Sequence, residues 1–134
     1  ELEHVEAYLE IEKARFSSKL QVEYDLKSED FLLPPFILQP LVENAVRHGI
    51  QPHPRGGVLH IASETNGACH IVTIQDSGVG FDVNNAVYSG NGIGLSNVSQ
   101  RLRSLYGPHF GLDIQSVPGL GTTCQVRIPR REVA

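Results

Sequence analysis

The stretch DSGVGF (Asp76–Phe81) is followed, nine residues further along, by GNGIGLSNV (Gly90–Val98). In the first segment, an aspartate at the end of a predicted strand precedes two glycines. In the second segment, three glycines lead into a predicted helix. Glycine has no side chain, so a ligand can lie directly against the backbone. The two segments therefore predict a ligand site built from one carboxylate and bare main chain.

Asp76 is the expected contact to the base of a nucleotide. A carboxylate accepts hydrogen bonds and donates none, so it favours the exocyclic amine of adenine and opposes O6 of guanine. Leaving such groups unpaired costs about 1–3 kcal/mol. Gly78 and Gly80 let the base approach the backbone, and we expect Thr122 and Thr123 to supply a hydroxyl through water. Taken alone, Asp76 also has a simpler interpretation as a turn residue, because Asp-Ser-Gly is common in turns.

The second segment predicts a phosphate site. Gly90, Gly92 and Gly94 free main-chain N–H groups to surround an anion, and the helix expected to begin near Leu95 directs its positive end towards it. The glycines are spaced G-x-G-x-G and no strand comes directly before them, so the dinucleotide fingerprint does not apply. A flexible linker is the simpler alternative, although the direct entry into a helix argues against it.

A helix predicted within PPFILQPLVENAVRHG (residues 34–49) adds polar groups to the site. The side-chain oxygen of Asn44 is a suitable ligand for Mg²⁺. Arg47 and His48 follow one turn later and have the reach to contact phosphate oxygens. Each also has a simpler interpretation, Asn44 as a helix cap or bridge and the other two as solvent-exposed residues. Gly49 is expected to end this helix.

The hydrophobic periodicity predicts the order helix, strand, helix, two strands, loop, helix and two strands. An Asn-Gly turn joins the two central strands as a hairpin, and residues 82–91 are expected to form a mobile loop. Because helices do not connect all the strands, we expect an α/β fold in which a mixed sheet carries its helices on one face, a two-layer α/β sandwich. The strands are expected at residues 20–26, 58–64, 69–78, 111–117 and 123–129.

Composition narrows the class of protein. The 134 residues are enough for one domain with a hydrophobic core, and the net charge of −4 argues against nucleic acid as a partner. No apolar run approaches the roughly 20 residues that cross a bilayer, so we expect a cytoplasmic domain. Cys69 and Cys124 are expected to be reduced thiols rather than a disulfide. The chain has no Met and begins within a helical pattern, so we expect a fragment of a larger protein.

Four segments in order resemble one known family. LQPLVENAVRHG, DSGVGF, GNGIGLSNV and GLGTT (residues 119–123) resemble the N, G1 and G2 boxes and the terminal Gly-Thr strand of the histidine-kinase/Hsp90/gyrase/MutL ATP-binding fold, the Bergerat-type fold. YLEIEKARF (residues 8–16) and SNVSQRLRSLYG (residues 96–107) are similar to LytS-type bacterial sensor histidine kinases. The resemblance covers essentially the whole chain.

The resemblance implies the ATP-binding domain of a sensor histidine kinase over residues 17–134, preceded by a helix over residues 1–16 that continues from an upstream segment. It implies ATP and Mg²⁺ as cofactors, Asn44 as the metal ligand and residues 82–91 as a lid over the nucleotide. It places no catalytic residue in the chain, because the phosphoacceptor histidine lies upstream. The implied cofactor-binding residues are Asn44, Arg47, His48, Asp76, Gly78, Gly80, Gly90, Gly92, Gly94, Leu95, Thr122 and Thr123.

The same resemblance implies partners. An upstream dimerisation domain carries the phosphoacceptor and makes the full-length protein a homodimer, and a response regulator receives the phosphate. The fragment itself is expected to be monomeric. The resemblance also makes the full-length parent protein a candidate for anchoring in the inner membrane.

The sequence departs from the ATPases of this family at one decisive position. These ATPases place a water-activating Glu one helical turn before the Asn, and that position is Pro40 here. Glu43 points about 100° round the helix from Asn44 and is a poor substitute. No separate phenylalanine box is present, although Phe81 is a candidate within the lid, and His4 is expected to be a solvated helix residue. The alternatives are an autonomous ATPase of the gyrase or Hsp90 type and a degenerate nucleotide-binding scaffold.

Overall fold

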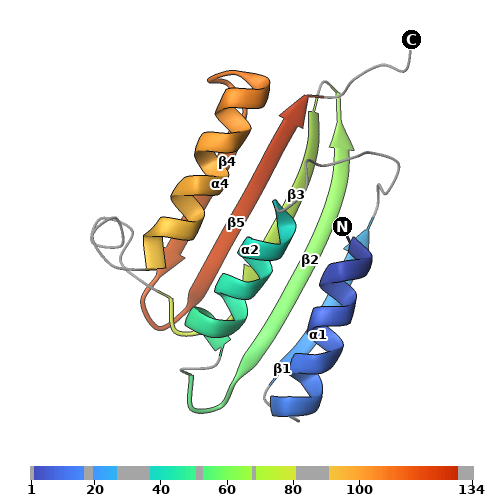
Figure 1. Cartoon of the computed structure of the whole chain (residues 1–134). Coiled ribbons are helices and arrows are strands. Elements are labelled where there is room, and N and C mark those ends of the chain that lie inside the picture. Colours follow the sequence, from blue (N-terminus) through green and yellow to red (C-terminus); the bar gives the residue numbers. More distant parts are fainter. Residues whose placement is uncertain are drawn as a thin grey trace.

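The computed structural model describes residues 2–16, 20–26, 37–50, 53–67, 69–80 and 91–129. Helices cover one face of a sheet, so the chain forms two layers (Figure 1). This confirms the predicted α/β sandwich and its order of elements. The elements are α1 (Leu2–Phe16), β1 (Leu20–Leu26), α2 (Leu38–Asn44), the π-helix η2 (Ala45–Ile50), β2 (Gly57–Asn66), β3 (Cys69–Asp76), α4 (Asn91–Tyr106), β4 (Gly111–Val117) and β5 (Gly121–Pro129).

The sheet is mixed, as predicted. Its strand order is β1-β2-β3-β5-β4. β1 pairs with β2 in parallel, which requires the crossover that contains α2. The β2–β3, β3–β5 and β4–β5 pairs are antiparallel. Gly67 adopts φ +51 directly after β2, which agrees with the expected hairpin turn.

The core lies between the sheet and the helices. Alternate residues along each strand face the helical layer, as the two-residue period of a strand requires. Val5 and Leu9 of α1 belong to the same buried cluster as the central strands, so α1 packs onto the sheet rather than standing apart from it. The largest fully buried side chains are Leu9, Ile37, Leu41, Leu59, Ile61, Ile74, Leu102, Val5, Val42, Val46 and Val126.

The helix that follows β1 changes its winding partway. Pro40 lies in the first turn of α2, where its missing N–H is not needed. After Asn44 the chain continues as a π-helix to Ile50, so Gly49 does not end the helix as predicted. Gly49 is not among the glycines with positive φ, and its carbonyl accepts a hydrogen bond from the N–H of Val79 at 2.9 Å. A tertiary contact therefore takes the place of the expected glycine cap.

Further element boundaries differ from the sequence predictions, since β2 spans Gly57–Asn66 instead of residues 58–64 and β3 ends at Asp76 instead of residue 78. α4 begins at Asn91 instead of near Leu95, and β5 begins at Gly121, two residues early. Residues 82–90, most of the predicted lid, lie outside the described residues. Within the described part of the chain, no helix combines the length and the apolar character that crossing a membrane needs. Cys69 and Cys124 are both free thiols.

Candidate nucleotide-binding site

Asp76 is a buried carboxylate at the end of β3. It is 5% exposed, because the alternation of the strand turns its side chain to the same face as Val72 and Ile74. The chain then turns away, and the N–H of Gly78 donates a hydrogen bond to Oδ1 of Asp76 at 2.9 Å. The carboxylate is thus oriented by the segment that follows it.

Thr122 faces Asp76 from the neighbouring strand. The two residues are partners in the β3–β5 register, and Thr122 is also buried. Its hydroxyl lies 2.7 Å from the hydroxyl of Ser116 on β4. Thr123 pairs instead with the exposed Gln75, so alternation directs its side chain to the opposite face of the sheet. The structure brings Thr122, and not Thr123, to the predicted base contact.

Burial changes the acidity of two groups in this site. Loss of solvent raises the pKa of Asp76 from 3.8 to about 6, and hydrogen bonds from the backbone of Gly78 and Thr122 act in the opposite direction. Burial, with a smaller contribution from the Asp76 charge, raises the pKa of the Cys124 thiol to about 12. At neutral pH the site therefore contains one carboxylate in a poorly solvated environment beside a neutral thiol.

Glycines allow η2, residues 77–80 and the turn between β4 and β5 to pack closely together beside Asp76. A Cβ atom on Gly78 would overlap the backbone carbonyl of Gly49, and one on Gly49 would lie 2.6 Å from Oδ1 of Asp76. Gly80 adopts φ +67, and a Cβ there would overlap the carbonyl of Val117. Predicted residues Gly78 and Gly80 thus lie where a side chain does not fit. The contact made by Gly49 was not predicted.

The segment after Asp76 is also fixed by backbone hydrogen bonds on both sides. The N–H of Val79 donates to the carbonyl of Gly49 at 2.9 Å. The N–H of Gly119, in the turn between β4 and β5, donates to the carbonyl of Val79 at 2.6 Å. Residues 77–80 are therefore held between η2 and the β4–β5 turn.

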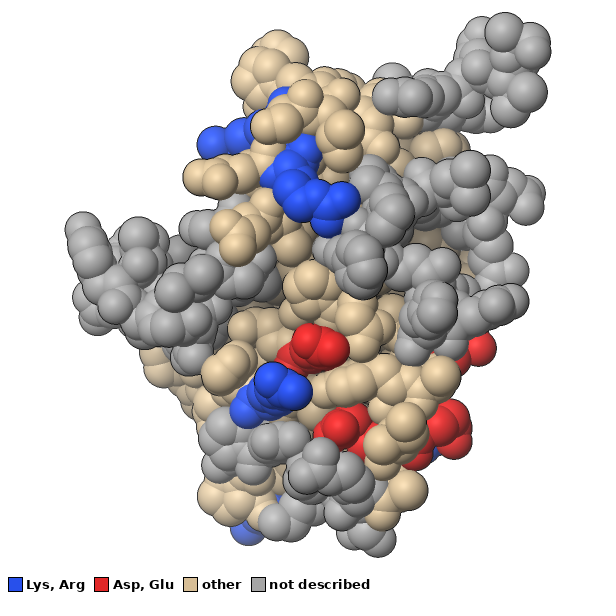
Figure 2. Space-filling model, in the orientation of Figure 1, with Lys and Arg blue, Asp and Glu red and all other residues tan. Residues whose placement is uncertain are grey.

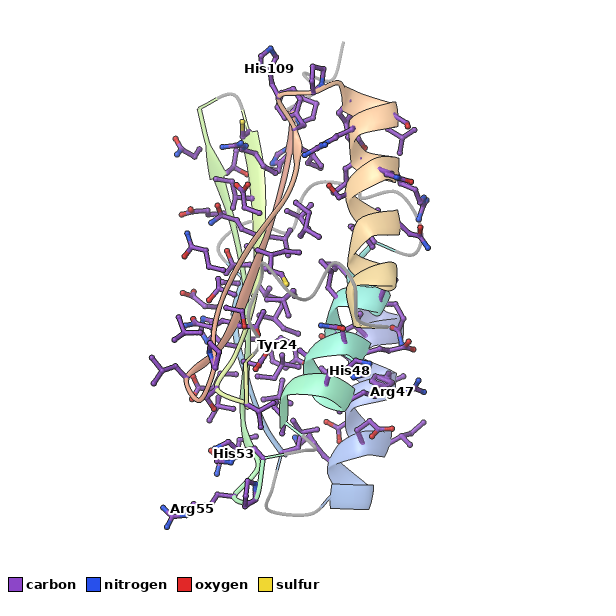
Figure 3. All side chains as sticks on the ribbon, turned by 90° about the vertical axis from the view of Figure 1, so that its left-hand side faces the viewer. Tyr24, Arg47, His48, His53, Arg55 and His109 are labelled. Atoms are coloured by element: carbon purple, nitrogen blue, oxygen red, sulfur yellow. The ribbon has the colours of Figure 1, made fainter. Side chains whose placement is uncertain are left out.

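Asn44, Arg47 and His48 lie along the helix beside this segment. Asn44 is the last residue of α2 and is half-buried. Arg47 and His48 are exposed on η2 and extend away from the sheet (Figure 3). Burial and the charges of Glu12 and Glu43 raise the pKa of Tyr8 on α1, and the positive charge of Arg47 opposes this effect. Arg47 therefore lies close enough to α1 to interact with Tyr8, which the sequence did not predict.

The predicted phosphate segment contains the start of α4. Gly92, Gly94 and Leu95 lie in the first turns of α4, whereas Gly90 lies outside the described residues. Because α4 begins at Asn91, the first unpaired N–H groups of the helix belong to the glycine segment itself. The segment is thus a helix start rather than a loop before a helix.

The helix side of the molecule carries both signs of charge. Figure 2 shows small groups of basic and acidic side chains on this face, and near its centre a basic group lies beside an acidic one. Among the described residues, no group of three or more His, Cys, Asp or Glu side chains is placed to hold a metal ion. Glu43 accepts a hydrogen bond from the side-chain amide of Gln39 at 3.1 Å, one turn earlier on the same helix. That contact engages the one carboxylate next to Asn44.

Comparison with known proteins identifies the family. Residues 33–132 match the family described as histidine kinase-, DNA gyrase B-, and HSP90-like ATPase. The sensor histidine kinase BtsS of Escherichia coli is 39% identical over 137 residues, which is 100% of this chain and 24% of that protein. The sensor protein LytS of Staphylococcus haemolyticus is 31% identical over 144 residues, covering 99% of this chain and 24% of that protein. The chain therefore spans about a quarter of the length of these relatives.

Solved structures agree on the fold. The Acinetobacter baumannii histidine kinase AdeS has a TM-score of 0.73 at 21% identity, over 98% of this chain and 64% of that chain. The mycobacterial sensor histidine kinase MprB has a TM-score of 0.67 at 19% identity, over 98% and 95% of the two chains. The chain belongs to the family of histidine kinase-, DNA gyrase B- and HSP90-like ATPases, as an ATP-binding catalytic domain of the sensor histidine kinase type.

Proposed function

We propose that this chain binds Mg-ATP and presents the γ-phosphate to a histidine on an upstream dimerisation domain of the same protein. The observation that carries the proposal is the buried carboxylate of Asp76, which lies where bare glycine backbone meets the end of a strand. A buried carboxylate needs hydrogen-bond donors, and the exocyclic amine of adenine is one. Its family supplies the expectation that the nucleotide is ATP.

The described residues suit the parts of a nucleotide. Asp76 accepts the adenine amine, and Thr122 offers a hydroxyl beside it on the next strand. The free N–H groups at the start of α4, in the segment of Gly92, Gly94 and Leu95, suit phosphate oxygens. We assign the exposed side chains of Arg47 and His48 to the phosphates as well.

A magnesium ion fits this site only together with the nucleotide. No cluster of acidic side chains among the described residues holds a cation by itself. An amide oxygen such as that of Asn44 suits an Mg²⁺ ion that takes most of its ligands from phosphates and water. When bound, the ion neutralises charge on the phosphates.

The chain favours transfer to a protein acceptor over hydrolysis. Removing a proton from water requires a base within hydrogen-bond reach. Pro40 occupies the helix position that would provide the base, and the carboxylate of Glu43 is engaged by Gln39 at 3.1 Å. The chain's own role is to orient the phosphate and shield its charge while the acceptor comes from elsewhere.

The relatives suggest the setting of this domain. BtsS and LytS are each about four times as long as this chain, and they are named a sensor histidine kinase and a sensor protein. We propose that residues 17–134 are the ATP-binding domain and that α1 is the end of a helix from the dimerisation domain. In the full-length homodimer, a response regulator would take the phosphate from the histidine. We place the domain in the cytoplasm, with the parent protein anchored in the inner membrane.

Incubation with γ-labelled ATP tests the proposal. The isolated chain should hydrolyse ATP very slowly and remain unlabelled, His4 included. Addition of the separately produced upstream helical segment should label a histidine on that segment, and Asn44→Asp should reduce the labelling. Brisk hydrolysis by the chain alone would instead favour an autonomous ATPase, and label on His4 would move the acceptor into this chain.

A further inference from the structure

Gly49 approaches the Asp76 carboxylate from the helical layer. A Cβ atom at residue 49 would lie 2.6 Å from Oδ1 and 2.9 Å from Cγ of Asp76. Non-bonded carbon and oxygen atoms do not approach this closely, so a side chain here would displace either the carboxylate or the end of η2. The carboxylate therefore occupies a space that exists because residue 49 has no side chain.

The backbone of Gly49 is itself fixed by the segment after Asp76. Its carbonyl accepts the N–H of Val79 at 2.9 Å, and a Cβ on Gly78 would overlap the same carbonyl. The N–H of Gly78 in turn donates to Oδ1 of Asp76 at 2.9 Å. Gly49, Gly78 and Asp76 thus form a closed set of contacts, in which a shift of one residue moves the other two.

The π-helix accounts for the position of Gly49. α2 ends at Asn44, and η2 carries the chain from Ala45 to Ile50 with Gly49 buried near its end. A π-helical turn is wider than an α-helical turn and changes which residues face a neighbouring element. Such turns occur frequently at functional sites. Here the wider turn presents residue 49 to the carboxylate.

We propose that Gly49 determines nucleotide specificity as a positioning residue, because it keeps the Asp76 carboxylate in the orientation that accepts the exocyclic amine of adenine. This inference rests on the proposed function, since the orientation has a consequence only when a base is bound. The contacts proposed for magnesium and the phosphates lie on Asn44, on α4 and on the exposed side chains of Arg47 and His48, whereas Gly49 is buried against Asp76. A side chain at residue 49 therefore affects the choice of base more than it affects binding of the triphosphate.

Calorimetry with two triphosphates tests this assignment. One is Mg-ATP, and the other is the magnesium complex of the purine riboside triphosphate that lacks the 6-amino group. The wild-type chain should prefer ATP by about tenfold or more, because a hydrogen bond to a charged acceptor is lost with the analogue. Gly49→Ala should reduce this preference to about threefold or less, mainly by weakening ATP binding.

Gly57→Ala is the matched control. A Cβ at residue 57 would lie 2.8 Å from Oγ of Ser77, so it introduces a similar contact one residue away from Asp76. It should change the affinities for both triphosphates by the same factor and leave their ratio intact. A purely structural effect of Gly49→Ala would have that same pattern, and this result would overturn the inference.

The remaining outcomes are also decisive. Full preference for ATP in Gly49→Ala overturns the inference and leaves the proposed function standing. Absence of any preference in the wild-type chain overturns both. If Gly49→Ala does not fold, thermal unfolding of Gly49→Ala/Asp76→Ala decides, because the second change removes Cγ and both carboxylate oxygens, the atoms that the new Cβ would meet. A restored cooperative transition supports the contact, and continued failure to fold overturns it.

Discussion

Asp76 and Thr122 are partners in the register of β3 and β5, and both side chains are buried on the face of the sheet that the helices cover. The hydroxyl of Thr122 also lies 2.7 Å from that of Ser116. A threonine can share its hydroxyl with a neighbour at little cost, whereas the hydrogen bonds that Asp76 accepts from the backbone replace only part of the hydration that its buried carboxylate loses. The fold therefore carries a local destabilising group at the point where the adenine is expected to bind.

Asp76→Asn is expected to stabilise the fold at pH 8. The pKa of Asp76 is about 6 in the folded chain, above its ordinary value of 3.8, so the folded state holds its proton more tightly than the unfolded state. The contribution of Asp76 to stability should be greatest below pH 4, fall between pH 4 and 6 and stay low above that range. The shift corresponds to roughly 2–3 kcal/mol. Chemical unfolding of both proteins at pH 4 and pH 8 measures the difference.

The difference between the two proteins supplies the control. At pH 4 both residues are neutral in the folded chain, so the advantage of Asn should nearly disappear. Equal stabilities at pH 8 would show that Asp76 is well solvated in the folded chain. Cys124 is a titratable residue near Asp76. Its thiol remains neutral between pH 4 and pH 8, because its pKa is about 12.

ATP affinity is expected to have the opposite pH dependence. The adenine amine needs the ionised carboxylate as acceptor, so ATP binding should weaken as the pH falls through about 6, while the free protein becomes more stable. The phosphates of ATP also titrate near this pH. In Asp76→Asn, only the titration of the ATP phosphates remains to change the affinity with pH. The difference between the pH profiles of ATP affinity for the wild-type chain and for Asp76→Asn therefore measures the effect of the Asp76 carboxylate. Identical profiles would contradict a role for Asp76 in binding the base.

The two cysteines should react at different rates. Cys124 is buried and its pKa is about 12, so roughly 1 thiol in 10,000 is ionised at pH 8. Cys69 is half-buried at the start of β3. Treatment of the folded chain with a maleimide, followed by peptide mass spectrometry, should give label on Cys69 first and on Cys124 only after unfolding. Rapid labelling of Cys124 in Cys69→Ser would contradict its burial.

The sequence predicted the layers and the place of Asp76 at the end of a strand, because both follow from local patterns. Two-residue alternation defines the strands, and an aspartate directly after such a strand faces the layer that its neighbours face. The same alternation already separates Thr122 from Thr123, since Thr122 shares a face with Cys124 and Val126. Assigning both threonines to the site overlooked this signal.

Other features depend on contacts that no local pattern contains. The π-helix brings Gly49 to Asp76 through a tertiary hydrogen bond with Val79, and a glycine in this position otherwise predicts a helix end. The proximity of Arg47 to Tyr8 requires knowledge of how α1 packs on α2. Such relationships between distant segments emerge only when the elements are assembled.

Two leucines on α4 test the packing of the helical layer. Leu102 is 0% exposed in the core, whereas Leu105, three residues later, is 53% exposed. Leu102→Ala should lower the free energy of unfolding by about 2–5 kcal/mol, because it removes buried methyl groups and leaves a cavity. Leu105→Ala should change it by about 0.5 kcal/mol or less. Comparable losses for the two variants in chemical unfolding would contradict the orientation of α4.

The most direct test of the account is a calorimetric titration of the chain with Mg-ATP and, separately, with Mg-GTP. Because O6 of guanine would face the Asp76 carboxylate, we expect saturable binding of one ATP per chain and at least about tenfold weaker binding of GTP. In Asp76→Asn, whose amide can also donate, this preference should largely vanish. Equal affinities for ATP and GTP in the wild-type chain would contradict the assignment of Asp76 as the adenine contact.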